Sequence, residues 1–310
     1  MAHQGYGNYM ERRMRLKKIS VILPVYNEEL FLPHTLANIE EYVDEIIVID
    51  GSDKGASTDK TAEIAQSHPK VKYYSGIFLS DFGGWDTAKQ RNDVLKYVTG
   101  DVMMLLSADM LLYNMEILKN AVEKDYDLFG VSSIEFWLDT KHIRVHNPSY
   151  DINSTPAENY KIIAVNMNCD PSFDINGNII TAQYVEYDRC LYIPQSILFH
   201  FGWIRPFKQQ VQKHIRHVTM GLWGESGLQL LRLPYEDLEK WAIRHALTYS
   251  ESRCLNYYGI IPDCDEELLN MRFDKGCNDV LEEYENKYGI KVLDYIHKKE
   301  NKNAEIHKGK

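Results

Sequence analysis

Residues 19–24 of the chain read Ile-Ser-Val-Ile-Leu-Pro, and residues 46–52 read Ile-Ile-Val-Ile-Asp-Gly-Ser. Each stretch contains an apolar run of strand length, and the β-branched residues of the second are typical of a parallel strand buried on both faces. Further short apolar runs follow at 71–74 and 102–106. Strands at this spacing predict an α/β fold with an open, mostly parallel sheet, in which ligands bind beyond the carboxyl ends of the strands.

Helical patterns fill the intervals between these runs. Leu32, Leu36, Ile39 and Val43 recur at helical spacing, and a second helix is expected at 58–66. Asp86 is a suitable N-cap for a third helix that continues through Val98 and stops before Gly100. The helices therefore flank the sheet, and a helical C-terminal extension is expected from the pattern after Phe207.

Composition restricts the function. The chain has 310 residues, of which 44% are hydrophobic and 26% charged, as in an ordinary globular protein. A net charge of −10 argues against non-specific binding to nucleic acid or to anionic membranes. Five cysteines at irregular spacings predict reduced thiols and neither a disulfide framework nor a structural zinc site. We see no secretory signal and no apolar run long enough to span a bilayer, so a cytoplasmic protein is expected.

Polar residues follow three of the predicted strands. Tyr26 can lie flat against a base, and Asn27-Glu28 can open the next helix, but the glycine-rich turns of dehydrogenases and P-loop enzymes are missing there. Asp50 could accept a hydrogen bond from the imino N–H of a base, or could form a turn before Gly51. Asp109 is costly to bury among apolar residues unless a divalent cation on a diphosphate compensates it; the alternative is a helix cap.

These segments together resemble a family-2 glycosyltransferase of GT-A fold. The resemblance rests on 19–52, on Lys89-Gln90-Arg91-Asn92, and on Gly100-Asp101 leading to Ser107-Ala108-Asp109. It covers about residues 18–112 and implies a Rossmann-like sheet that binds a nucleotide-diphospho-sugar with Mn²⁺ or Mg²⁺. It also implies that Asp50 reads a uracil-like base edge and that Asp109 is the last acid of the Asp-x-Asp metal motif. Ser107 departs from that motif because the first acid is absent.

The resemblance extends to the residues expected at the donor. Of Lys89 and Arg91, only one is expected to face the diphosphate, because they lie on different faces of their helix; solvated surface is the alternative for both. Trp203 is expected to line the sugar or acceptor pocket, and Arg205 is expected to stabilise the leaving diphosphate. The full set of expected donor-binding residues is Pro24, Tyr26, Glu28, Asp50, Lys89, Arg91, Ser107, Ala108, Trp203 and Arg205.

His200 is the second expected metal ligand, beside Asp109. It follows a predicted strand, and the segment Phe199-His200-Phe201-Gly202-Trp203 resembles the His-Phe/Tyr-Gly-Trp stretch of certain family-2 members. Some GT-A enzymes complete their metal site with a histidine at about this distance from the metal motif. An imidazole beside oxygen ligands suits Mn²⁺ better than Mg²⁺. The alternative is a histidine packed in the core.

A carboxylate must deprotonate the hydroxyl acceptor in a direct displacement. Glu186 and Asp188 are the nearest acids before His200 and are the catalytic candidates, with Glu135 and Asp174 as rivals.

We expect a flexible lead-in at 1–15, a nucleotide-sugar-binding half at 16–136, an acceptor-binding and metal-completing half at 137–233 and a helical extension at 234–310. The predicted function is transfer of a sugar from a UDP-sugar to a hydroxyl of a saccharide, lipid-linked sugar, protein or modified nucleobase. A sugar-nucleotidyltransferase and a non-catalytic nucleotide- or glycan-binding relative remain alternatives, the second because of Ser107.

Overall fold

The computed structural model describes residues 16–81, 83–144, 160–174, 177–182, 187–220, 229–230, 232–249, 254–262, 264, 266–271 and 277–289. The chain divides into two compact units. Unit 1 comprises Met1–Ile134 and Asp151–His200, and unit 2 comprises Glu135–Tyr150 and Phe201–Lys310.

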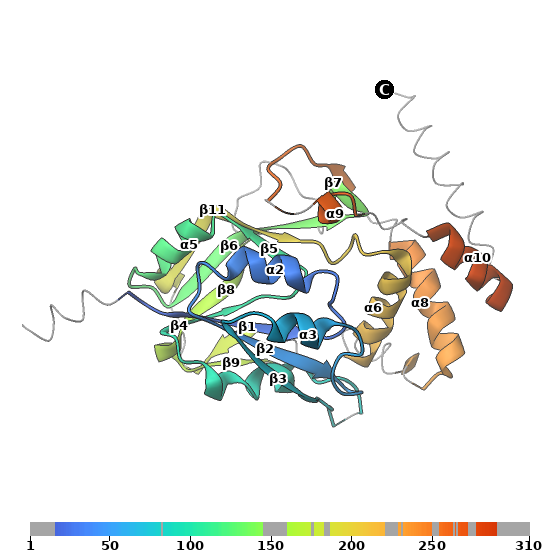
Figure 1. The fold of residues 1–310 in the computed structure, drawn as a ribbon, viewed down its shortest axis with the longest axis horizontal. Helices are drawn as coiled ribbons and strands as arrows, with labels where there is room; N and C mark the ends of the chain where they lie inside the picture. Colours follow the sequence, from blue (N-terminus) through green and yellow to red (C-terminus); the bar gives the residue numbers. More distant parts are fainter. Residues whose placement is uncertain are drawn as a thin grey trace, which may run out of the picture. The chain divides into compact units, whose positions relative to one another are not determined.

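Unit 1 has a parallel core, with β3 (Val71–Ile77), β2 (Glu45–Ser52), β1 (Ile19–Val25) and β4 (Val102–Leu105) side by side in this order (Figure 1). Every residue of β2 is buried, as its β-branched composition predicts. Val25 lies opposite Asp50, so β1 and β2 end at the same edge of the sheet. The expected α/β fold with a parallel sheet is confirmed.

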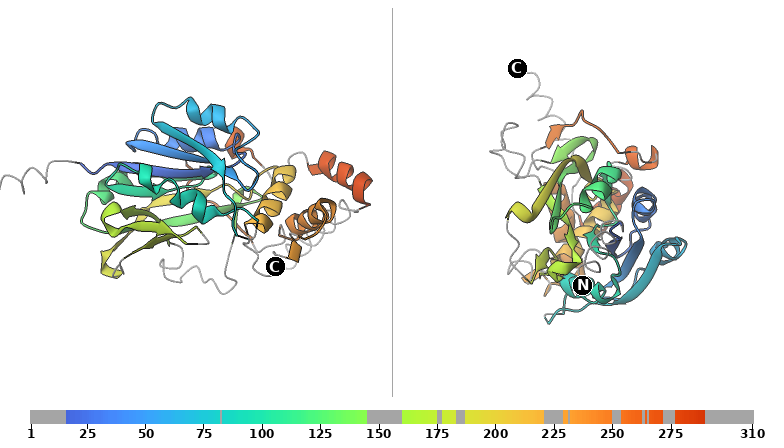
Figure 2. Two further views of the ribbon diagram at one scale, coloured as in Figure 1. Left: turned by 90° about the horizontal axis from the view of Figure 1, so that it is seen from below. Right: turned by 90° about the vertical axis from the view of Figure 1, so that its left-hand side faces the viewer.

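Helices connect these strands. They are α2 (Leu32–Ile39), α3 (Thr61–Gln66), α4 (Thr87–Asn92) and the 3₁₀ turn η1 (Leu95–Tyr97). Figure 2 shows α2 and α3, in blue, on one face of the sheet. Asp86 caps α4 as predicted, because its Oδ1 accepts a hydrogen bond from the backbone N–H of Lys89 at 2.7 Å. The helix expected through Val98 instead ends at Asn92, and the one expected from residue 58 begins at Thr61.

Antiparallel strands extend the parallel core. β8 (Tyr160–Asn166) pairs with β4, β6 (Leu128–Trp137) pairs with β8, and β11 (Cys190–His200) pairs with β5 (Met110–Tyr113). Strands β8 and β11 belong to unit 1, because they complete this sheet, whereas the expected half at 137–233 grouped them with residues of unit 2. The other elements of unit 1 are α5 (Met115–Val122), η3 (Met167–Cys169), η4 (Tyr187–Arg189) and the two-stranded sheet of β9 (Pro171–Phe173) and β10 (Ile179–Thr181).

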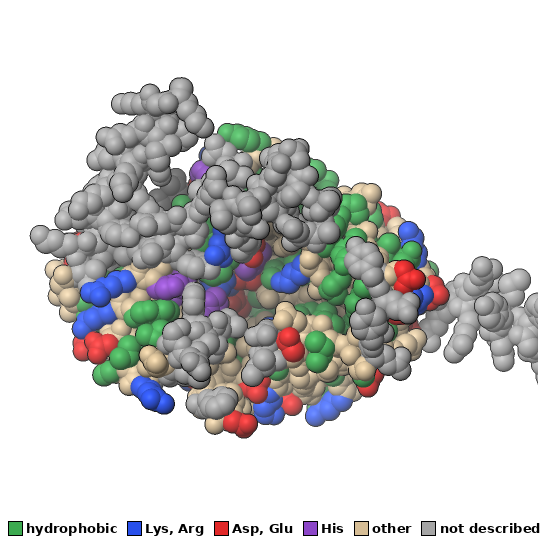
Figure 3. All heavy atoms as spheres, turned by 180° about the vertical axis from the view of Figure 1, so that it is seen from behind, with side chains coloured by type: hydrophobic (Ala, Val, Ile, Leu, Met, Phe, Trp, Pro, Cys, Tyr) green, Lys and Arg blue, Asp and Glu red, His purple; other side chains and the backbone are tan. Residues whose placement is uncertain are grey.

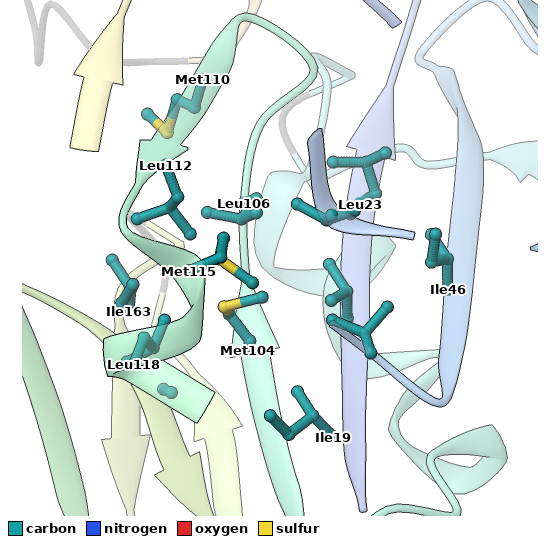
Figure 4. Close-up of a cluster of buried hydrophobic side chains, with 14 of the residues drawn as sticks. Ile19, Leu23, Ile46, Met104, Leu106, Met110, Leu112, Met115, Leu118 and Ile163 are labelled. Atoms are coloured by element: carbon teal, nitrogen blue, oxygen red, sulfur yellow. The ribbon is translucent and has the colours of Figure 1, made fainter. Parts of the chain in front are cut away.

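The core of unit 1 lies between this sheet and its helices. Figure 4 shows Leu23 of β1, Met104 of β4, Leu112 of β5 and Leu118 of α5 among the side chains that meet there. These side chains are almost completely buried. Burial of apolar area at this level stabilises the sheet and holds its carboxyl edge in a fixed position.

Unit 2 consists mainly of helices. The end of β6 pairs with β7 (Asp139–Arg144), which pairs with β12 (Cys254–Asn256). Its helices are α6 (Phe207–Thr219), α8 (Tyr235–Tyr249), α9 (Glu266–Leu269) and α10 (Cys277–Tyr288). Apolar residues of α6 and α8, with Tyr284 of α10, form a second core. The helical pattern expected after Phe207 is thus present.

Candidate active site

Three segments meet at the carboxyl edge of the parallel core. Residues 26–28 follow β1, Asp50 lies near the end of β2, and Ser107–Asp109 follow β4. Tyr26, Asn27 and Glu28 are half-buried, and so are Pro24 and Ser107. The strand alternation therefore gathers the residues expected from the sequence at one edge, where α/β sheets bind their ligands.

Asp50 is enclosed by donors from the protein itself. Its side chain is 0% exposed. Oδ1 accepts hydrogen bonds from the Ser57 backbone N–H at 3.0 Å and from Ser57 Oγ at 2.6 Å. Oδ2 accepts one from the Tyr73 hydroxyl at 2.7 Å. Burial raises the pKa of Tyr73, and so does its bond to Asp50, which keeps the hydroxyl protonated as the donor.

The turn after β1 is tied to the segment after β2. Asn27 adopts φ +53°, in the left-handed region. Its backbone N–H donates to Ser57 Oγ at 2.8 Å, and its Oδ1 accepts from the Thr58 backbone N–H at 2.8 Å. The Glu28 backbone N–H donates to Thr61 Oγ1 at 2.7 Å. These bonds fix the backbone conformation of the turn that carries Tyr26 and Glu28.

An aromatic pair stands beside this turn. The rings of Tyr26 and Trp85 meet edge to face, with centroids 5.6 Å apart. Tyr26 is placed by the end of β1, and Trp85 immediately precedes the cap of α4. Trp85 is buried and packs against the half-buried Tyr26, so the pair places aromatic side chains next to the hydrogen-bonding groups of this edge.

Asp109 and His200 come together, although 90 residues separate them in the chain. The antiparallel register places His200 at the end of β11 opposite Met110. The distance from Asp109 Oδ1 to His200 Nε2 is 3.5 Å. Both side chains are largely buried, with exposed fractions of 7% and 14%. Thr35 Oγ1 donates to the carbonyl of Ala108 at 2.5 Å, which fixes the backbone next to Asp109.

The Asp109–His200 pair fits part of the coordination shell of a divalent cation. A carboxylate oxygen and an imidazole nitrogen are the donor set of a manganese-type ion. Among the residues that the structure describes, no group of three or more His, Cys, Asp or Glu is arranged to hold a metal. The two side chains could supply two ligands of such an ion, and Ser107 brings no charge to the site.

Lys89 and Arg91 occupy different environments on α4, as expected from their spacing. Lys89 is half-exposed, and its Nζ lies 2.7 Å from Asp93 Oδ2. Arg91 lies against the turn between β9 and β10, where a Cβ on Gly177 would come within 1.6 Å of its Nη1. Burial lowers the pKa of Arg91 to about 10, while the charge of Asp174 opposes this shift.

Trp203 and Arg205 belong to unit 2. Trp203 packs on Trp137 with ring centroids 5.4 Å apart, the guanidinium of Arg144 lies over both rings, and the ammonium of Lys213 lies over Trp203. Arg205 is completely buried. Trp203 therefore belongs to an aromatic and cationic cluster of unit 2.

Histidines adjoin this cluster. The rings of His214 and His245 lie 4.8 Å apart, and Figure 3 shows a group of histidine side chains on one face of the molecule. Desolvation lowers the pKa of His214 to about 3, assisted by repulsion from His245 and Lys213. His214 is therefore neutral at physiological pH.

Of the two candidate catalytic acids, the structure describes only Asp188. Glu186 lies outside the described residues. Asp188 is exposed at the start of β11, whereas His200 ends the same 11-residue strand. A strand of this length spans roughly 35 Å, so Asp188 is too remote to act at Asp109. This is a correction: the sequence order placed Asp188 before His200, but the extended strand carries the two to opposite edges of the sheet.

The two rival acids are held by other partners. Asp174 accepts hydrogen bonds from the backbone N–H and the side-chain amide of Asn178, at 2.8 and 3.1 Å. Glu135 belongs to unit 2, where its carboxylate lies 3.9 Å from Arg144. No general base is identified among the described residues.

Comparison with known proteins establishes the family. The model of glycosyl transferase family 2 matches residues 20–179, just over half of the chain. The chain belongs to this family. The resemblance read from the strand ends is therefore confirmed, and the protein is an enzyme of the glycosyltransferase class.

Two curated relatives match a shorter part of this family-2 glycosyltransferase. Undecaprenyl-phosphate 4-deoxy-4-formamido-L-arabinose transferase of Photorhabdus laumondii is 34% identical over 128 residues, which are 37% of this chain and 37% of that protein. The enzyme of the same name from Sodalis glossinidius is 30% identical over 130 residues, 39% of this chain and 38% of that protein. The matches thus span less than two-fifths of the length of these relatives.

Solved structures of similar fold include two complexes with nucleotide sugars. One is the mannosyltransferase PcManGT from Pyrobaculum calidifontis in complex with GDP-Man and Mn²⁺, with 17% identity, a TM-score of 0.39 and coverage of 77% of this chain and 76% of that chain. The other is S. aureus TarS 1-349 in complex with UDP-GlcNAc, with 15% identity, a TM-score of 0.37 and coverage of 75% and 80%. In the described part of this family-2 enzyme, no helix is long and apolar enough to cross a membrane.

Sequence reasoning missed three residues at the carboxyl edge of the sheet. Ser57 and Tyr73 were not singled out as site residues. Gln90 is 1% exposed, and its Nε2 donates to the carbonyls of Ile49 and Gly51, at 3.0 and 3.1 Å. Its position four residues after the Asp86 cap, on the buried side of α4, was the available signal.

Proposed function

We propose that this family-2 glycosyltransferase transfers a sugar from a UDP-sugar to a phosphate-bearing lipid acceptor, with a divalent cation held by Asp109 and His200. The observation that carries the proposal is the 3.5 Å approach of these two side chains at the carboxyl edge of a family-2 sheet. Asp109 and His200 are far apart in sequence. They meet because β11 pairs with β5 in the register that places His200 opposite Met110, next to Asp109.

The ion, when bound, would offset the negative charge that develops on the leaving diphosphate. The chain's own contribution is to orient its two ligands. Thr35 holds the backbone beside Asp109 through the Ala108 carbonyl, and pairing with β5 holds the strand that ends at His200. A carboxylate with an imidazole favours Mn²⁺ over Mg²⁺, since Mg²⁺ prefers oxygen ligands throughout.

The donor nucleotide is assigned to the turn at 26–28. Tyr26, with Trp85 beside it, provides an aromatic surface on which a base can pack. The loop is half-buried and therefore partly accessible, and its conformation is fixed by bonds to Ser57, Thr58 and Thr61. A preformed turn of this kind lowers the entropic cost of binding the nucleotide.

The acceptor assignment is supported by the relatives. Both curated relatives are named as transferases to undecaprenyl phosphate, and both match the chain at 30% identity or more. A lipid phosphate would differ from the saccharide, lipid-linked sugar, protein and nucleobase acceptors considered from the sequence. The family match favours sugar transfer over nucleotidyl transfer, which would release pyrophosphate.

A transfer assay tests the proposal. Purified protein is incubated with Mn²⁺, a panel of UDP-sugars, and either undecaprenyl phosphate or a soluble oligosaccharide, and released UDP and glycosylated product are measured. We expect UDP release that depends on Mn²⁺ and rises with undecaprenyl phosphate. Release stimulated only by oligosaccharide would overturn the acceptor, release of pyrophosphate would overturn the reaction class, and nucleotide binding with no turnover would support the non-catalytic alternative.

A further inference from the structure

We infer that Thr35 and Asn38, one turn apart on α2, are positioning residues of the proposed metal site. They hold β5 and the turn that carries Asp109, and through β5 they set where His200 lies. The inference rests on the proposed use of Asp109 and His200 as metal ligands. In this role Thr35 and Asn38 contact neither the ion nor the substrate, and they act through the backbone of the segment that follows β4.

Asp109 lies in a tight turn between β4 and β5. The Met110 backbone N–H donates to the Ser107 carbonyl at 3.1 Å, which closes the turn around Asp109. Thr35 Oγ1 lies 2.5 Å from the carbonyl oxygen of Ala108 and 3.2 Å from that of Met110. The single proton of this hydroxyl is therefore shared by the carbonyls on either side of Asp109. Thr35 thus fixes the direction in which the turn presents the carboxylate.

Asn38 holds β5 beyond this turn. Its Nδ2 donates to the Leu112 carbonyl at 3.0 Å, and its Oδ1 accepts from the Leu112 backbone N–H at 2.8 Å. A side-chain amide that bonds to both backbone groups of one residue takes the place that a neighbouring strand would fill. Among the strands that the structure describes, β5 pairs only with β11. The helix α2 therefore supplies hydrogen bonds to the other edge of β5.

The position of β5 also determines where His200 lies. In the antiparallel register, Met110 of β5 is directly opposite His200 of β11. Asp109 precedes Met110, and its Oδ1 lies 3.5 Å from His200 Nε2. A shift of β5 would therefore change the geometry of the two ligands relative to each other. Thr35 and Asn38 hold β5 at the edge that β11 leaves open and so prevent such a shift.

Burial shows that α2 is a firm support and that the Thr35 hydroxyl has a purpose. Leu32, Leu36 and Ile39 of this helix are completely buried in the core of unit 1. Thr35 is also 0% exposed. A buried hydroxyl costs free energy unless it is hydrogen-bonded, and a valine of the same shape would fill the space without that cost. The bonds to the turn therefore explain a threonine here better than packing does.

Binding of Mn²⁺ separates positioning from a purely structural role. Thr35→Val removes the hydroxyl and keeps the shape, Thr35→Ser keeps the hydroxyl, and Asn38→Ala removes the amide. The Mn²⁺ affinity of each folded protein is measured by electron paramagnetic resonance, without and with UDP, and the free energy of unfolding is measured in urea. We expect Thr35→Val to weaken Mn²⁺ binding about tenfold and Asn38→Ala about threefold, whereas Thr35→Ser should stay within about twofold of the wild type.

Ser196→Ala is the matched control on the same pair of strands. Ser196 is 0% exposed, and its Oγ donates to the Tyr113 carbonyl at 3.1 Å, at the far end of β5. It precedes His200 by four residues of β11, which is roughly 13 Å along an extended strand. This variant also loses a buried hydroxyl and should lose stability, but its Mn²⁺ affinity should equal that of the wild type.

Several results would overturn the inference. Wild-type Mn²⁺ affinity in folded Thr35→Val would make Thr35 a structural residue only. Equal weakening in Thr35→Ser or in Ser196→Ala would show that the hydroxyl, or its location, does not matter. Should Thr35→Val fail to fold, Asn38→Ala carries the test, because Asn38 is half-buried, and unchanged affinity there would overturn the inference. A wild type that binds no Mn²⁺ would refute the proposed metal site and this inference with it, a result distinct from altered affinity in the variants.

Discussion

The two ends of the parallel core use buried carboxylates differently. At the amino end, Glu45 of β2 accepts hydrogen bonds from Ser20 Oγ at 2.5 Å, from Lys72 Nζ at 2.5 Å and from the Thr99 backbone N–H at 2.6 Å. These partners come from β1, from β3 and from the segment before β4. One side chain thereby links the starts of all four parallel strands. At the carboxyl end, Asp109 instead meets a histidine from a distant antiparallel strand.

We interpret this difference as buried carboxylates in two roles: Glu45 stabilises the fold, and Asp109 takes part in the reaction. Burial alone would raise the pKa of Glu45, but the bonds from Lys72, Ser20 and Thr99 outweigh it and lower that pKa from 4.5 to about 2. Glu45 is therefore stabilised as an ion by partners that are themselves structural. Asp109 faces an imidazole, which is a metal ligand as readily as a hydrogen-bond partner. We expect changes at the amino end to alter folding and changes at the carboxyl end to alter activity.

The largest effect is expected from Asp109→Ala. It removes the only acid of the metal motif, and loss of charge stabilisation on the leaving diphosphate should reduce turnover by at least about a hundredfold. UDP release with Mn²⁺ measures this, and the melting temperature should change little. Asp109→Asn, which keeps the size of the side chain, is the matched control and should be almost as inactive. Activity within about threefold of the wild type would remove Asp109 from the metal site.

Glu45→Ala should produce the opposite pattern. A pKa lowered to about 2 in the folded protein corresponds to roughly 3 kcal/mol of stability at neutral pH, and the variant should lose that amount. Urea unfolding at pH 7 measures the loss. At a temperature where both proteins are folded, activity should remain near that of the wild type. A variant of unchanged stability with impaired turnover would invert the comparison between the two ends.

The same residue predicts a pH dependence. The pKa of Glu45 is lower in the folded than in the unfolded chain, so its contribution is fully present above about pH 4.5 and is lost as the pH falls toward 2. The difference in unfolding free energy between wild type and Glu45→Ala should therefore shrink from pH 5 to pH 3. Stability curves at several pH values test this, and a difference that stays constant over this range would contradict it.

His200→Ala tests the second partner at the carboxyl end. As a metal ligand, His200 should account for part of the Mn²⁺ affinity, and the half-saturating Mn²⁺ concentration should rise about tenfold, with reduced preference for Mn²⁺ over Mg²⁺. Titration of activity against both ions measures this. A histidine that only packs in the core would instead lower the melting temperature and leave the Mn²⁺ titration unchanged.

The sequence predicted where the parallel strands lie better than it predicted which distant residues contact one another. Apolar runs and their spacing located β1, β2, β3 and β4, because parallel strands buried on both faces carry an unambiguous composition. The pairing of Asp109 with His200 was suggested by the position of His200 after a predicted strand and by family resemblance. No local pattern reports that β11 is antiparallel to β5, so register between distant strands has to be seen in the structure.

Other contacts had no signal in the sequence. The sequence pattern of an aspartate at the end of a strand is the same whether its side chain faces a ligand or the protein interior. That Asp50 is enclosed follows only from its hydrogen-bond donors Ser57 and Tyr73 in the structure. Asp188 was misplaced for a related reason. It is close to His200 in sequence, but an 11-residue extended strand separates the two residues in space.

The smallest effect is expected from Lys89→Ala. Lys89 lies on α4, so this variant compares an exposed helix charge with the two buried carboxylates Glu45 and Asp109. Lys89 and Asp93 form an i,i+4 pair on α4 at 2.7 Å, and both side chains are 47% exposed. Exposed pairs of this kind contribute about 0.3–0.5 kcal/mol and are screened by salt. We therefore expect the melting temperature, the affinity for UDP and turnover to stay close to wild type. Arg91→Ala is the matched comparison on the same helix, since it would empty the space under the β9–β10 turn and should be clearly destabilising. A loss of UDP affinity in Lys89→Ala that disappears at high salt would instead assign this lysine to the diphosphate.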